Sequence, residues 1–475
     1  MNYVLFFPDE LRAESLGCYG NTKINTPNFE RLAREGVLFE QCHVQNPVCS
    51  PSRCSLFTGQ YVHVNGHRTL WNLIKPYEKN LFRYFKEAGY EVRIYGKNDL
   101  FSEGAIPHSV DEFMNKPGLN RGKHSPVKEF GESGYYDFLY KPLDGDYTEH
   151  SDYQNVEAGI NFIKSWKKGD KPFVLFLPLL SPHCPYTIQE PFYSMYKEDD
   201  IRPLRESGVN KPEYYELIRQ YRDLSATDFK KIQAVYMGMA TFTDALLGHL
   251  MDSIREAGIE NDTMLIAASD HGDYAGDYNL VEKWPNACED VLTRVPLIIK
   301  GPGYHAGHRI KEQVELFDIM PTMMEDANIP IRHTCFAHSL VPQLKGAAGD
   351  PDRAVFCEGG YNPNEKHCNE GYPKEGTAFM SDKHTIYYPK GLQQFEHPGS
   401  VARTSMIRTL EYKLVMRSLG KSELYDLRKD PKELVNLSDN REYETIKKSL
   451  ELRLLNWYIE TSDVVPFEED LRDLR

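Results

Sequence analysis

Short apolar runs recur along most of the chain, and segments with helical spacing of apolar residues separate them. Several runs are apolar at every position, which is typical of strands that are covered on both faces of a sheet. The runs that predict strands are NYVLFF (2–7), EVRIYG (91–96), PFVLFLPLL (172–180), TMLIAAS (263–269), VPLIIKG (295–301) and AVFCEG (354–359).

Three segments between these runs predict helices. Residues 27–35 follow Thr26, a capping residue, and place Pro27 at the first helical position. Residues 79–88 have an apolar side, and the longest pattern extends over about residues 227–257. Alternating strands and helices predict an α/β fold with a mostly parallel sheet sandwiched by helices. In such sheets, ligands bind beyond the carboxyl ends of the strands.

The pattern changes after about residue 360. Residues 361–405 are rich in Gly, Pro, Asn, Lys and His, and 405–417 alternate like one half-exposed strand. Residues 422–437 suggest a short strand and a turn, and 441–461 an amphipathic helix. We therefore expect a smaller C-terminal α+β domain with an antiparallel sheet. The predicted domains are residues 1–360 and 361–475.

Composition narrows the class of protein. The 475 residues are 40% hydrophobic and 12% aromatic, as in an ordinary globular protein. A net charge of −14 argues against a nucleic-acid partner, and no apolar run of about 18 residues predicts a membrane span. Nine cysteines, an odd number, favour reduced thiols over a disulfide framework. The Met-Asn-Tyr start shows no secretion signal, which predicts a cytoplasmic location.

Two predicted strands end in potential metal ligands. The first strand leads into Asp9 and Glu10, and TMLIAAS leads into Asp270 and His271. The carboxyl ends of parallel strands meet at one edge of a sheet, so these side chains are expected to converge. Oxygen ligands suit Ca²⁺ or Mg²⁺, and the imidazole leaves Mn²⁺ open. The alternative is that each carboxylate is a solvated loop residue.

The stretch NPVCSPSRCSLFTG (46–59) holds a second candidate, Cys49. A cysteine at a helix start, close to Arg53, is placed to form a thiolate or to bind an anion. The alternative is a buried pair of thiols, Cys49 and Cys54, in a turn.

Three basic side chains follow other predicted strands or precede them. Lys97 follows EVRIY, His183 follows PFVLFLPLL, and Lys283 lies in the loop before VPLII. A lysine at a strand end can neutralise an oxyanion, and a histidine can act as a general acid. Taken singly, a lysine such as Lys97 is most often a surface residue and a histidine such as His183 most often a turn residue, and Lys283 alone indicates nothing.

Together these segments resemble the sulfatase family of the alkaline-phosphatase-like superfamily, over nearly the whole chain. The residues that match are YVLFFPDELRAESLGCYGN, CSPSRCSLFTG, YGKND, SPHCPY, SDHGDYAGDYNLVEKW, VPLIIKGPG, DIMPT and ELYDLRKDP. The specific element is the Cys-x-Pro-Ser-Arg signature, followed later by the Asp-His-Gly stretch.

The resemblance implies that Cys49 is oxidised to formylglycine by a formylglycine-generating maturation enzyme, which recognises Pro51 and Arg53. Hydrated formylglycine is a geminal diol. One hydroxyl attacks sulfur, the ester oxygen leaves, and the second hydroxyl then expels sulfate.

The resemblance also implies roles for the other candidates. Asp9, Glu10, Asp270 and His271 would bind a divalent cation, Ca²⁺ or else Mn²⁺ or Mg²⁺, together with the modified Cys49. Arg53 and Lys97 would stabilise the nucleophile and the sulfate oxygens, and Lys283 would contact sulfate. His183 would protonate the leaving oxygen or hydrogen-bond to it.

Two positions depart from the family pattern. Many members have two aspartates where this chain has Asp9-Glu10. The longer Glu10 therefore binds metal directly, binds it through a water, or lies behind the direct ligands. The usual Lys-x-His is Lys97-Asn98-Asp99 here. Asp99 therefore acts as the base, contacts substrate, or leaves the base role to another histidine such as His67 or His108.

The sequence thus predicts a sulfuric ester hydrolase that acts on a small polar or carbohydrate sulfate ester. Polar insertions at 100–150 and 361–405 are expected to rim the pocket. The alternative within the superfamily is a phosphonate monoester or phosphodiester hydrolase. A non-catalytic carbohydrate-binding relative would be expected to lack Cys49, Arg53 or Lys97. An oligomer is possible.

Overall fold

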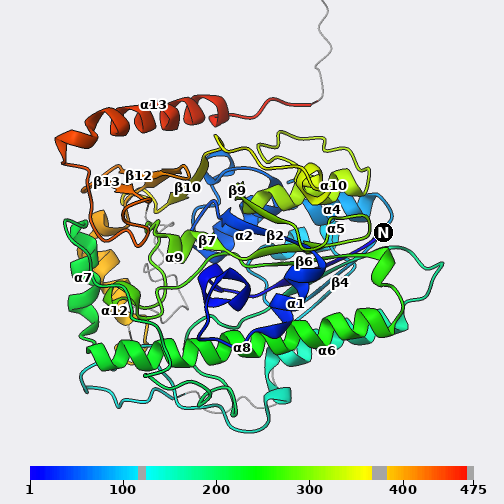
Figure 1. Cartoon of the computed structure of the whole chain (residues 1–475), viewed down its shortest axis with the longest axis horizontal. Coiled ribbons are helices and arrows are strands. Elements are labelled where there is room, and N and C mark those ends of the chain that lie inside the picture. Colours follow the sequence, from blue (N-terminus) through cyan, green and yellow to red (C-terminus); the bar gives the residue numbers. More distant parts are fainter. Residues whose placement is uncertain (116–124, 366–381, 468–475) are drawn as a thin grey trace, which may run out of the picture.

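The computed structural model describes residues 1–115, 125–365 and 382–467. A mixed sheet of nine strands forms its centre, in the order β4-β3-β5-β1-β6-β8-β2-β7, with β9 beside β2 (Figure 1). The strands are β1 (Asn2–Phe7), β2 (Val37–His43), β3 (Glu91–Tyr95), β4 (Glu112–Met114), β5 (Phe173–Pro178), β6 (Thr263–Ala268), β7 (Arg294–Val295), β8 (Leu297–Lys300) and β9 (Arg309–Glu315).

The middle of this sheet is parallel, as the apolar runs predict. Strand β1 pairs in parallel with β5 on one side and with β6 on the other. All six residues of each of these three strands are buried. The mostly parallel α/β architecture is therefore confirmed, and the carboxyl ends of β1, β5 and β6 share one edge.

Alternate residues of β1 enter two separate cores. Val4 and Phe6 pack with α1 (Pro27–Glu35), α6 (Ser151–Ser165) and α8 (Ala226–Glu256). Tyr3, Leu5 and Phe7 pack on the opposite face with α2 (Cys49–Thr58), α4 (Leu81–Glu87) and α10 (Ile319–Asp326). The sheet is therefore sandwiched by helices (Figure 1).

Seven further α-helices lie in the described part of the chain. They are α3 (Val62–Asn65), α5 (Ile106–Ser109), α7 (Glu213–Arg222), α9 (Asp290–Thr293), α11 (Val341–Leu344), α12 (Tyr388–Glu396) and α13 (Glu444–Thr461). In the described part of the chain, no helix combines the length and the apolar character that crossing a bilayer requires.

A second sheet is antiparallel and has the order β10-β11-β12-β13. Its strands are β10 (Val355–Gly359), β11 (Thr404–Arg408), β12 (Tyr412–Arg417) and β13 (Glu423–Asp426). The predicted C-terminal antiparallel sheet is therefore present. The prediction of one strand over 405–417 is wrong, because the chain reverses after Arg408 and the two halves pair with each other.

Gly238 sets how closely α8 approaches the segment that carries Phe192. A methyl group at Gly238 would overlap the carbonyl oxygen of Phe192, and backbone cannot move aside as a side chain can. We expect Gly238→Ala to destabilise the protein by about 1–3 kcal/mol in thermal unfolding. Gly159→Ala in α6 is the matched control, since its methyl group would meet only leucine side-chain tips at 3.1 and 3.2 Å. Equal melting temperatures of the two variants would contradict this account.

Candidate active site

The ends of β1 and β6 bring their acidic residues together. Phe6 lies opposite Ala267 in the parallel register, and three residues further on Asp9 stands beside Asp270. The Glu10 amide donates to Asp270 Oδ1 at 3.2 Å, which ties the two strand ends. Asp9, Glu10 and Asp270 are fully buried, so they are not solvated loop carboxylates.

Cys49 begins α2 and points into this edge. Its Sγ lies 3.4 Å from Asp9 Oδ1 and 3.2 Å from His271 Nε2. The other ring nitrogen of His271, Nδ1, is 2.8 Å from the Gly272 carbonyl oxygen. A carbonyl can only accept, so Nδ1 carries the proton and the Nε2 lone pair faces Cys49.

The thiol of Cys49 is uncharged in this setting. Burial raises the pKa of Cys49 well above its ordinary value, and the nearby Asp9 carboxylate adds to the effect. Arg53 does little to offset this shift, because its guanidinium pairs with Asp9 and Asp270. The expectation of a thiolate or a bound anion at the helix start stays a prediction. Cys54 is a packed thiol. It is buried in α2, within the core formed on the α2 face of the sheet.

Arg53 and Lys97 hold the two aspartates in place. Arg53 donates from Nε to Asp270 Oδ2 at 2.8 Å and from Nη2 to Asp9 Oδ2 at 3.0 Å. Lys97 donates to the same Asp9 oxygen at 2.7 Å, and its Nζ lies 3.8 Å from Cys49 Sγ. Within the described residues, Arg53 Nη1 is buried without a hydrogen-bond partner, which leaves one donor for a bound group.

Lys283 occupies the other side of the site. Its Nζ contacts Glu10 Oε1 and lies 3.2 Å from His183 Nε2. His183 Nδ1 faces the Cys184 carbonyl and therefore carries a proton. Burial, together with the charge of Lys283, lowers the pKa of His183 well below its ordinary value, so the ring is neutral and its Nε2 accepts from Lys283.

Asp99 lies at the opening of the site, where the family pattern has a histidine. Asp99 Oδ2 is 2.8 Å from Lys97 Nζ, and the two side chains keep 21% and 23% of their surface exposed. The alternative histidines are placed elsewhere. His67 contacts Asn72 and Glu78 through its two ring nitrogens, and His108 is exposed on α5.

The donor atoms at this edge fit a divalent cation. Asp9, Cys49, Asp270 and His271 each bring one ligand atom, all within 4.8 Å of one another. A second grouping of the same tightness replaces Asp270 and His271 with Glu10 and His183. Two carboxylates and an imidazole lone pair are donors that suit Ca²⁺, Mg²⁺ or Mn²⁺. Direct binding of Glu10 stays a prediction, because its Oε1 contacts Lys283.

The charged side chains at this edge carry no excess of positive charge before any cation binds. Each of the three buried carboxylates pairs with a basic side chain, so the group as a whole has no excess of positive charge. A bound divalent cation would make the sum positive, which is what an anionic ester requires. The pairs are Asp9 with Arg53 and Lys97, Asp270 with Arg53, and Glu10 with Lys283.

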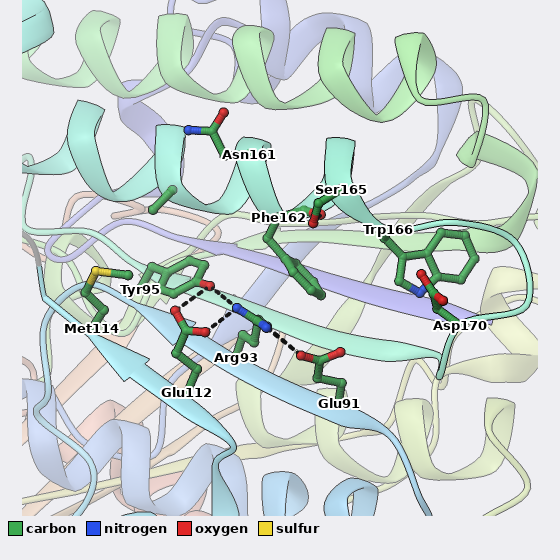
Figure 2. Close-up of a pocket in the computed structure, with 11 residues that line it drawn as sticks. Glu91, Arg93, Tyr95, Glu112, Met114, Asn161, Phe162, Ser165, Trp166 and Asp170 are labelled. Atoms are coloured by element: carbon green, nitrogen blue, oxygen red, sulfur yellow. Dashed lines mark hydrogen bonds and ion pairs between the residues drawn. The ribbon is translucent and has the colours of Figure 1, made fainter.

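A separate pocket of about 390 Å³ lies at the far edge of the main sheet, between β3, β4 and α6. Figure 2 shows Arg93 inside it, between Glu91 and Glu112. Arg93 pairs with both carboxylates and lies over the ring of Phe162. Its charge is thus neutralised, and the pocket contains none of the predicted site residues.

Two family models match the chain. The model described as Sulfatase matches residues 1–329, which include every predicted site residue. The chain belongs to the sulfatase family. The model described as N-sulphoglucosamine sulphohydrolase, C-terminal, matches residues 374–459, most of the second sheet and α13.

One curated relative and two solved structures illustrate what the chain is similar to. The sulfatase is 26% identical to an arylsulfatase of Clostridium perfringens (strain 13 / Type A), covering 93% of this chain and 91% of the relative. Its fold matches a phosphonate monoester hydrolase of Agrobacterium radiobacter with a TM-score of 0.79 and 22% identity, covering 97% and 96% of the chains. It also matches BT4656, solved with its substrate D-glucosamine-2-N,6-O-disulfate, with a TM-score of 0.73 and 20% identity over 99% of both.

Sequence reasoning missed two residues that support this sulfatase site. Ser52 donates its hydroxyl to the Asp270 carbonyl oxygen at 2.6 Å and so joins α2 to the end of β6. Its place inside the Cys-x-Pro-Ser-Arg signature was the available signal. Glu282, next to Lys283, lies 3.3 Å from the Lys283 ammonium. Nothing in the local sequence distinguishes Glu282 from a surface glutamate.

Proposed function

We propose that this sulfatase hydrolyses a sulfate monoester of a small polar or carbohydrate substrate, using formylglycine made from Cys49 and a bound divalent cation. The observation on which this rests is the position of Cys49 Sγ, which lies within 3.2–3.8 Å of His271, Asp9 and Lys97. A thiol there is uncharged and buried, so oxidation to an aldehyde gives the position a use that the thiol lacks. When hydrated, formylglycine supplies one hydroxyl for attack and a second to expel sulfate.

The side chains around position 49 would orient the ester. The unpartnered Nη1 of Arg53, with Lys97 and Lys283, supplies positive charge for the sulfate oxygens. When bound, the cation would be held by Asp9, Asp270 and His271 and would lower the pKa of a hydroxyl at position 49. Lys283 is the proton donor nearest His183, so these two side chains would share the task of neutralising the leaving oxygen.

A carbohydrate substrate is supported by two similarities. The C-terminal family model is described as N-sulphoglucosamine sulphohydrolase, C-terminal, and BT4656 was solved with D-glucosamine-2-N,6-O-disulfate. The predicted rim, 100–150 and 361–405, lies partly outside the described residues, at 116–124 and 366–381. Rim contacts to a sugar therefore remain a prediction from composition.

The experiment is a substrate panel with metal-loaded protein made together with a formylglycine-generating enzyme. We expect turnover of sulfated monosaccharides and aryl sulfates. A sulfate monoester and a phosphonate monoester each carry one negative charge on a tetrahedral centre, so the basic residues alone do not separate them. Preference for phosphonate monoesters or phosphodiesters by 100-fold or more would favour the alternative activity.

Asp99→Asn tests the departure from the family pattern. The amide keeps the shape of Asp99 but removes the negative charge that faces Lys97 Nζ at 2.8 Å. We expect kcat to fall by about 10²-fold if Asp99 is the base that restores the aldehyde, with a burst of leaving group retained. A rise in KM with an unchanged kcat would instead identify a substrate contact.

The matched control is Asp111→Asn, which removes a carboxylate from the surface pair with Lys86. It should leave both kinetic constants unchanged. Unchanged turnover and an unchanged burst in Asp99→Asn would show that Asp99 has neither role.

A further inference from the structure

The loop that delivers Lys283 is held in an unusual backbone conformation. Ala275, Tyr278, Asn279 and Glu282 have φ angles of 43°, 58°, 57° and 62°, in the left-handed region that favours glycine. A residue other than glycine keeps such an angle only where contacts with the surrounding structure hold it there. The loop therefore has a shape that neighbouring elements impose.

Glu282 precedes Lys283 directly, so the imposed backbone conformation of Glu282 sets where the Lys283 side chain begins. Its amide donates to the Tyr186 hydroxyl at 2.9 Å, and its carbonyl accepts from the Tyr274 amide at 3.0 Å. The carboxylate is buried and accepts twice from Lys390 Nζ, at 2.8 and 3.1 Å. Main chain and side chain of Glu282 are therefore both fixed.

Lys390 comes from α12, more than a hundred residues further along the chain and inside the segment that the C-terminal family model matches. Besides its two contacts with Glu282, its Nζ lies 3.4 Å from the carbonyl oxygen of Lys283 itself. The Lys390 ammonium thus contacts both the Glu282 carboxylate and the main chain of Lys283.

Lys283 Nζ lies between competing partners. On the catalytic side it meets Glu10 and, at 3.2 Å, His183 Nε2, while on the other side Glu282 Oε1 is 3.3 Å away. A buried carboxylate requires a compensating positive charge. As long as Lys390 supplies that charge, Lys283 is free to remain with Glu10 and His183.

We propose that Lys390 is a positioning residue, which keeps the Lys283 ammonium at the leaving-group side of the site by neutralising Glu282. This inference rests on the proposed function only for its kinetic readout. Without Lys390, the nearest described cations are Lys283 and, at 4.0 Å, Arg222, so Glu282 would draw Lys283 away from His183.

The test compares Lys390→Met with Lys390→Arg on aryl esters whose leaving groups differ in pKa. We expect Lys390→Met to lower kcat/KM by about 10–100-fold for the most basic leaving groups and much less for nitrophenol-type ones. Lys390→Arg keeps the charge and should restore part of the loss. Lys300→Met is the control, because Lys300 also neutralises glutamate side chains, Glu35 and Glu260, but at the end of β8.

Two double variants separate positioning from loss of structure. Glu282→Gln removes the unpaired charge, so Glu282→Gln/Lys390→Met should recover activity relative to Lys390→Met. In a Lys283→Met background, Lys390→Met should cause no further loss, since its effect passes through Lys283. An equal loss for every leaving group, or additive losses with Lys283→Met, would overturn the proposal.

A crystal structure of Lys390→Met tests the same idea without turnover. We expect Lys283 Nζ to have moved from His183 to Glu282. Lys283 Nζ still beside Glu10 and His183 would overturn the proposal, whichever ester the wild-type enzyme hydrolyses. Failure of the proposed function would be seen separately, as absence of sulfate ester hydrolysis by the wild type.

Discussion

Cys49→Ala is expected to abolish ester hydrolysis, with a loss of at least about 10⁴-fold in kcat. The substitution removes Sγ, the atom of residue 49 that faces Asp9, His271 and Lys97 together. The aspartates keep Arg53, so the variant should fold and melt near the wild-type temperature. Steady-state hydrolysis of an aryl sulfate, measured beside thermal unfolding, checks both expectations.

Cys49→Ser and Cys54→Ser complete the experiment. A serine at position 49 has one hydroxyl and no second one to expel sulfate, so at most a single burst of product is expected. Cys54→Ser should keep its activity, because Cys54 packs within α2 away from the ligand atoms. Mass spectrometry of the wild-type peptide should find residue 49 lighter than cysteine by about 18 Da. An unmodified thiol in fully active enzyme would contradict the formylglycine mechanism.

The sequence predicts those parts of the fold in which one local pattern decides the outcome. Continuous apolar runs place β1, β5 and β6 correctly, because strands covered on both faces need apolar residues at every position. Strand β2 (Val37–His43) escapes the pattern, since Glu40 and Gln41 interrupt its apolar residues. Its place in the sheet depends on β8 and β9, which are far away in the sequence.

In the site, too, local patterns predict some features, while contacts between distant segments decide others. The strand-end rule predicts that Asp9 and Asp270 meet, because register and direction follow from the parallel sheet. The rule does not predict which basic side chain pairs with each carboxylate. Asp9 accepts from both Arg53 and Lys97, and that sharing depends on the angle at which α2 enters the sheet edge. The contact of Lys390 with Glu282 joins residues too distant in sequence for any local pattern to show.

Asp9→Asn is expected to reduce turnover by about 10³-fold or more by removing the cation from the site. Asp9 Oδ2 already accepts from Arg53 and Lys97, and Oδ1 faces Cys49 and lies 3.7 Å from His271 Nε2. An amide has a single oxygen, so it cannot serve both the basic residues and a cation. If the oxygen stays with Arg53 and Lys97, the amide NH₂ group points at the cation position and repels it.

Metal content separates this explanation from a general loss of structure. Purified Asp9→Asn should contain little divalent cation by elemental analysis, while wild type binds about one per chain. The variant should remain folded, because Arg53 keeps Asp270 and Lys97 keeps Asp99. Asp326→Asn is the matched control, since that carboxylate accepts from the hydroxyls of Tyr3 and Tyr304 and belongs to none of the ligand groupings. A full complement of cation in inactive Asp9→Asn would show that Asp9 acts through Arg53 and Lys97 instead of through the metal.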